Sequence, residues 1–78
     1  MPRIVGDGTF EVYVYANDHN PPHCHLYWDG GDEDAMIDLR NLQVLFGNPK
    51  KQGMDLIANN LGVIRSMWNS LNPGKAIP

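Results

Sequence analysis

The chain has 78 residues, 42% of them hydrophobic, which is typical of one small globular domain spanning residues 1–78. Nine acidic and six basic residues give a net charge of −3, and the basic residues form no stripe, so nucleic-acid binding by the monomer is not expected. One cysteine excludes an internal disulfide, and the chain has neither a signal peptide nor a membrane-spanning stretch, so we expect a cytoplasmic protein.

Alternating hydrophobic residues predict a first strand over residues 9–15. A short strand at Ile4 and Val5 can precede it. The side chains expected in the core are Phe10, Val12 and Val14. The side chains expected on the opposite face are Glu11, Tyr13 and Tyr15.

The same alternation predicts a second strand over residues 23–28. Its core-facing side chains are expected to be Cys24, Leu26 and Trp28. Its outward side chains are expected to be His23, His25 and Tyr27. After a glycine turn, a third strand over residues 34–39 is predicted to point Asp38 outward, and a short fourth strand follows at residues 43–46.

One helix is predicted from Pro49 to about Ser70, because Asn48 can cap a helix that begins with proline. Gly62 is the expected point of close approach between this helix and the sheet. Apolar residues at alternating spacings of three and four form its buried stripe: Met54, Ile57, Leu61, Ile64, Trp68 and Leu71. The predicted fold is therefore α+β, a small antiparallel sheet of three to four strands packed against one C-terminal helix.

One short segment holds all three histidines and the only cysteine, around a double proline. It reads Asn17-Asp18-His19-Asn20-Pro21-Pro22-His23-Cys24-His25. Two consecutive prolines restrict the local backbone, so the flanking histidines are presented with little freedom. The segment is the strongest candidate for a functional site.

This segment, with the tyrosine-rich strand before it and a start of the Met-Pro-x-Ile type, resembles the signature of domain of unknown function 4160, a family of small bacterial and phage proteins. The resemblance implies a few antiparallel strands plus one helix. Members resemble accessory genes of the toxin–antitoxin kind, which implies a small protein partner. The chain departs from the family pattern at Cys24, where an aromatic residue is usual, and at residues 40–43, where a turn containing glycine is usual.

We favour a partner- or ligand-binding module over an enzyme. If the first two strands pair, the tyrosines and histidines share one face that is both aromatic and polar, as at many protein and ligand sites. The predicted binding residues are Tyr13, Tyr15, Asn17, Asp18, His19, Asn20, His23, His25 and Tyr27. An open strand edge and a small core also make a homodimer plausible.

The main alternative is a metal-dependent hydrolase or nuclease. His23 and His25 would project from one face, and His19 could fold back to supply a third nitrogen for zinc, nickel or iron(II). Asp38 is a weaker candidate ligand, and an open coordination position would activate water. Strand alternation places Cys24 opposite both rings, so it is expected to be a buried, inert thiol.

Two further interpretations stay open. Asp18 and His19 could form a metal-independent acid–base pair, although a local turn explains the same residues without chemistry. A phage inhibitor that sequesters a host defence protein or a nucleotide signal is compatible with the small size and with the adjacent Lys50 and Lys51. No catalytic residue is assigned.

Overall fold

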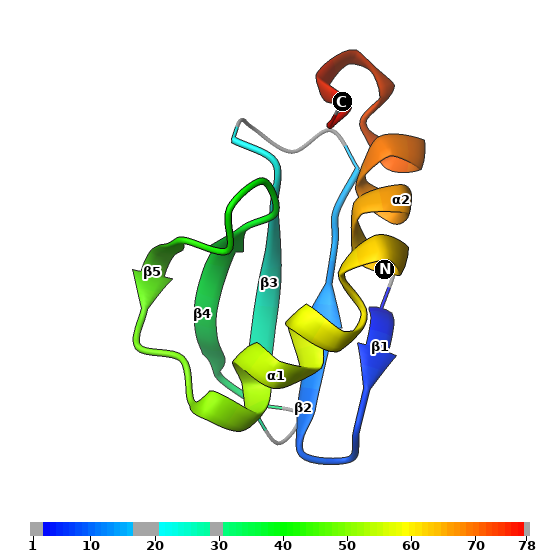
Figure 1. Cartoon of the computed structure of the whole chain (residues 1–78). Coiled ribbons are helices and arrows are strands. Elements are labelled where there is room, and N and C mark those ends of the chain that lie inside the picture. The colour runs from blue at the N-terminus through cyan, green and yellow to red at the C-terminus, as the bar shows by residue number, and fades with distance from the viewer. Residues whose placement is uncertain (1–2, 17–20, 29–30, 78) are drawn as a thin grey trace.

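The computed structural model describes residues 3–16, 21–28 and 31–77, which form an antiparallel sheet and two α-helices (Figure 1). Its strands are β1 (Arg3–Gly6), β2 (Phe10–Tyr13), β3 (His23–Trp28), β4 (Glu33–Asp38) and β5 (Val44–Gly47). They are neighbours in chain order, so every connection joins adjacent strands. The α+β prediction is confirmed, but the expected three to four strands are five, because the short segment around Ile4 and Val5 is a full edge strand.

The prediction of one C-terminal helix is wrong. The chain forms α1 (Lys51–Asn59) and α2 (Leu61–Leu71), followed by the 3-10 helix η1 (Pro73–Lys75). At Asn60 the backbone leaves helical geometry, and the side-chain amide donates to the Leu56 carbonyl at 2.9 Å. Asparagine competes in this way with the regular helical hydrogen bonds, which accounts for the break. Neither α-helix combines the length with the apolar character needed to cross a membrane.

The first helix begins at Lys51 rather than Pro49. Its N-cap is Lys50, which has extended backbone and no side-chain cap of its own. Instead, the Lys50 backbone N–H donates to the carboxylate of Asp34 at 3.2 Å. A carboxylate at this end is favourable because the first N–H groups of a helix lack internal partners. Asp34 of β4 therefore accepts a hydrogen bond at the helix start, where Asn48 was expected to do so.

Both helices cover one face of the sheet and enclose the core (Figure 1). The buried core residues are Phe10, Val12, Val14, Cys24, Leu26, Ala35, Ile37, Leu39, Ile57, Ile64 and Trp68. The predicted helical stripe thus packs inward on both sides of the break. Trp28 is the exception to the predicted core: it is 46% exposed, stacks on Phe10, and has the Lys50 ammonium 3.7 Å above its ring.

Candidate functional site

The sheet face away from the helices carries a connected group of rings. We call this group the tyrosine face and define it as Tyr13, Tyr15, His25 and Tyr27. Pairing of β2 with β3 sets Tyr13 opposite His25, as strand alternation predicts. Ring centroids lie 5.2 Å apart for Tyr13 and Tyr27 and 4.8 Å apart for Tyr15 and His25, both edge to face. These are favourable aromatic geometries, so the rings hold one another in place.

A hydrogen bond joins two tyrosines of this face. The hydroxyl oxygens of Tyr15 and Tyr27 are 2.9 Å apart. Burial raises the pKa of Tyr27, and the hydrogen bond with Tyr15 and the nearby charge of Glu33 raise it further. All three effects favour the neutral phenol. Tyr27 therefore offers a neutral hydroxyl that can donate or accept.

His25 is oriented by Glu33, a residue that the sequence did not single out. The Nδ1 atom of His25 lies 3.3 Å from a Glu33 carboxylate oxygen, and both side chains are mostly buried. Because an ionised carboxylate only accepts, Nδ1 carries the proton, and the Nε2 atom of a neutral ring holds the lone pair. The register places Glu33 opposite Tyr27, after a shift in the β3–β4 pairing that alternation alone does not reveal.

His23 is buried, which corrects the expectation that it faces water with the tyrosines. Its Nδ1 donates to the carbonyl of Pro21 at 2.7 Å. Its ring centroid lies 5.0 Å from that of His25 and 5.6 Å from that of Trp68. The histidines are therefore neighbours, but Trp68 of α2 packs against His23. This contact between residues far apart in sequence explains why strand alternation misjudged its exposure.

Asp38 is also buried rather than outward. It lies opposite His23 in the β3–β4 register. Its carboxylate accepts from the Arg40 backbone N–H at 2.7 Å and from the Arg40 guanidinium at 3.2 and 2.8 Å. Hydrogen bonding by Arg40 holds the pKa of Asp38 below its ordinary value. The structure thus gives this carboxylate a role in fixing the turn after β4.

The predicted metal ligands are brought together only in part. Asn17, Asp18, His19 and Asn20 lie outside the described residues. Within residues 3–16, 21–28 and 31–77, no group of three histidine, cysteine or acidic side chains is placed to hold a metal ion. Cys24 is buried on the core face, which confirms the expected burial, and that burial raises the pKa of its thiol to about 12.

The family model for a domain of unknown function (DUF4160) matches residues 9–68. The chain belongs to this family. The match runs from β2 to Trp68 and includes the whole histidine segment. Neither the curated proteins nor the solved structures yielded a match to the chain.

The turn after β4 of this DUF4160 domain holds a residue other than glycine in left-handed backbone geometry. Leu42 has a φ angle of 61°, in the left-handed region where glycine is favoured. The Leu42 side chain packs against the core. Arg65 of α2 donates to the carbonyl of Leu39 at 2.7 Å and fastens the turn from the helix side. Packing and hydrogen bonds therefore hold a backbone conformation that a glycine would adopt without strain.

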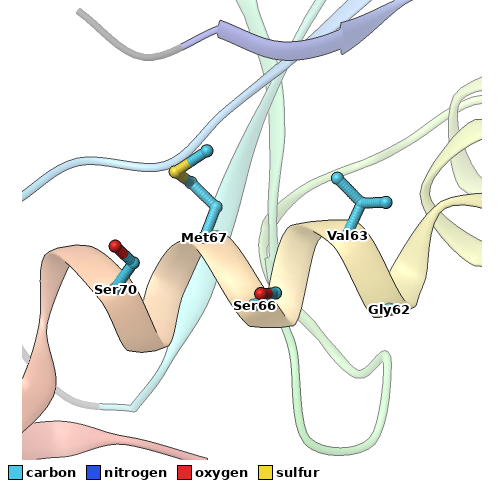
Figure 2. A pocket seen from close by; sticks show the side chains of 5 residues that line it. All are labelled: Gly62, Val63, Ser66, Met67 and Ser70. Carbon is cyan, nitrogen blue, oxygen red and sulfur yellow. The ribbon is translucent and has the colours of Figure 1, made fainter.

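A hollow on α2 of the DUF4160 domain is a weaker candidate site (Figure 2). It is lined by Gly62, Val63, Ser66, Met67 and Ser70. The lining contains no histidine, cysteine or acidic residue, so it offers neither a titrating group nor a metal ligand other than the methionine sulfur. The tyrosine face combines rings, hydroxyls and an imidazole, and is the better candidate.

Proposed function

We propose that this protein is a small partner-binding module and that the tyrosine face, with the histidine segment beside it, recognises the partner. The observation that carries the proposal is a set of four rings in mutual contact on a sheet face that neither helix covers (Figure 1). Tyrosine and histidine join an apolar body to a polar tip, and aromatic residues are enriched in protein interfaces.

The contacts among the rings also favour binding. Tyr15 is fixed by its hydroxyl bond to Tyr27, and His25 is fixed by Glu33. Side chains that are already ordered lose little conformational entropy when a partner docks. A broad sheet face suits a protein surface, and the family resemblance suggests an accessory role of the toxin–antitoxin or phage type. We therefore infer a protein partner.

The test is affinity capture from a lysate of a bacterium that encodes the protein. The baits are wild type, Tyr13→Ala, His25→Ala and a control, Val63→Ala, which alters an exposed residue of α2 away from the tyrosine face. A protein held by wild type and the control but lost with both face variants, and then bound as a purified component, supports the proposal. Capture of the same proteins by all four baits refutes it.

A second candidate function, a metal-dependent hydrolase or nuclease, has a specific observation in its favour. The rings of His23 and His25 are neighbours, and each Nδ1 lies against an oxygen acceptor, Pro21 or Glu33. Outer acceptors of this kind fix the tautomer and the ring orientation of histidine ligands in metal sites. His19 is the proposed third ligand for zinc, nickel or iron(II).

Elemental analysis of protein purified without a histidine tag separates the two candidates. Bound metal in a one-to-one ratio, lost in both His19→Ala and His25→Ala, together with a fall in Tm after chelation, would support the metal site. Absence of metal after incubation with each of the three ions would refute it and leave the binding proposal intact.

A further inference from the structure

The free edge of the sheet at β5 is apolar. Among the described strands β5 pairs only with β4, and it lies at the side of the sheet opposite β1 (Figure 1). Val44, Leu45 and Phe46 are 44%, 41% and 57% exposed, and they are three of the five large hydrophobic residues exposed in the described part of the chain. Residues 43–48 carry no charged side chain. Proteins usually protect an open edge with charges, so an uncharged apolar edge indicates an interface.

The described segments of this chain that could cover an edge are fastened elsewhere. The Trp68 indole donates to the carbonyl of Lys75 at 3.0 Å, and the Ile77 backbone N–H donates to the side chain of Asn69 at 2.7 Å. These bonds hold the C-terminal residues against α2, on the β1 side of the molecule (Figure 1). These described C-terminal residues therefore do not cover β5.

We propose that β5 pairs antiparallel with β5 of a second copy of this chain, so that two sheets join edge to edge. A two-fold axis places the outward backbone groups of one strand opposite the same groups of the other, as an antiparallel ladder requires. Two identical apolar edges also suit each other, because no like charges meet within residues 43–48.

The charges that flank the strand are compatible with this pairing. Arg40, before β5, is paired with Asp38 at 2.8 Å, and Lys50, after β5, is paired with Asp34 at 3.4 Å. In an antiparallel pair the start of one strand lies beside the end of the other. Each end of the joined edge therefore carries one ion pair from each subunit, and each ion pair is neutral overall.

The size of the edge sets the expected strength of the dimer. Stable interfaces bury about 800 Å² per subunit, whereas the monomer exposes 4377 Å² in total. A strand of four residues supplies only part of that interface, so the dimer should dissociate on dilution. Cross-strand partners form a row across the outer face of the sheet: Tyr13, His25, Met36 and Phe46. In the dimer this row would continue into the same row of the second copy.

Sedimentation velocity from micromolar to millimolar concentrations tests the proposal. The average mass of wild type should rise from 8.8 kDa toward twice that value. Phe46→Lys and Leu45→Lys should stay monomeric, because each places a cation at the two-fold contact. Val63→Lys is the matched control: Val63 is 55% exposed, similar to Phe46, but lies on α2, so this variant should dimerise like wild type.

The proposal is overturned by a monomer at every concentration, and equally by a dimer that forms as well in both β5 variants as in wild type. Two-dimensional NMR spectra of each variant establish that it is folded. Isotope-filtered contacts between labelled and unlabelled chains should connect β5 amides, and a dimer whose contacts lie elsewhere also contradicts it. The tyrosine face is left unaltered in these variants, so the outcome is independent of the proposed partner.

Discussion

Gly53 of α1 lies directly against Leu26 of β3. A Cβ atom at Gly53 would stand 2.6 Å from the Leu26 Cδ2 atom and 3.2 Å from the ring of Phe10. The sequence predicts such an approach at Gly62, and that prediction is wrong, because a Cβ there would meet nothing within 4 Å. The residue that lets the helix approach the sheet is therefore Gly53.

Replacing Gly53 by alanine should destabilise the protein. The added methyl group overpacks a buried contact, which typically costs about 1–3 kcal/mol, and alanine recovers at most about 1 kcal/mol through its higher helix propensity. We expect a net loss in the free energy of unfolding, measured by urea denaturation with circular dichroism. Gly62→Ala is the matched control and should be neutral or stabilising by up to about 1 kcal/mol. Equal effects of the two substitutions would contradict the packing at Gly53.

Local sequence patterns predicted the strands and their inner faces well. They predicted poorly how the helices run and which side chains the helices cover. The alternation of Phe10, Val12 and Val14 identifies the inner face, because that pattern depends only on neighbours in the chain. The exposure of Trp28 depends on how far the helices extend over that face. The break at Asn60 had a visible signal, two consecutive asparagines, which the strong apolar periodicity on either side outweighed.

The sequence also predicted the candidate site only in part. Strand alternation brings His25 and the tyrosines to one face, and the structure has them there. Burial of His23 depends on Trp68, and orientation of His25 depends on a register shift beside Glu33. Tertiary packing and register are not local properties, so no pattern within the histidine segment could have revealed them.

Asp38 should make stability depend on pH in the acid range. Its pKa is lowered in the folded state by the hydrogen bonds from Arg40, so its contribution is present above the unfolded pKa of about 3.9 and is lost as pH falls through the lower folded pKa. Asp38→Asn should reduce the free energy of unfolding at pH 7 by about 1–3 kcal/mol. The variant should also flatten the decline of stability below about pH 4.

Urea denaturation at several pH values, from pH 7 down into the acid range where stability declines, measures the loss of stability and the change in its pH dependence. Asp55→Asn serves as the control, because Asp55 is exposed and its carboxylate pairs with Lys51 one turn earlier in α1. Such surface pairs contribute about 0.3–0.5 kcal/mol. If Asp38→Asn behaved like the control, the ion pair between Asp38 and Arg40 would have no role in stability.

Cys24 should resist alkylation in the folded protein. Burial raises the pKa of its thiol to about 12, and only the thiolate reacts. At pH 8 the thiolate fraction should be lower than that of a free cysteine by about a thousandfold, and burial blocks access as well. Reaction with a chromogenic disulfide, followed with and without denaturing urea, measures the protection. Native protein that reacts as fast as unfolded protein would contradict the burial of Cys24.

Tyr27 should make stability depend on pH in the alkaline range. Its pKa is raised in the folded state, first by burial and then by the hydrogen bond with Tyr15. For a group with a raised pKa, the contribution to stability is complete below the unfolded value of about 10 and is lost as pH rises through the folded value. Stability should therefore fall above about pH 10, where the unfolded chain ionises first.

The Tyr15→Phe variant measures how much the hydrogen bond between the Tyr15 and Tyr27 hydroxyls contributes to the raised pKa of Tyr27. Removing this partner lowers the pKa of Tyr27 toward its ordinary value, so tyrosinate absorbance should develop at lower pH than in wild type, and stability should decline less steeply above about pH 10. Tyr13→Phe is the matched control, because the Tyr13 ring packs edge to face with Tyr27 while the bond between Tyr15 and Tyr27 is retained. Identical titration curves for the two variants would show that the bond across the tyrosine face does not contribute to the raised pKa of Tyr27.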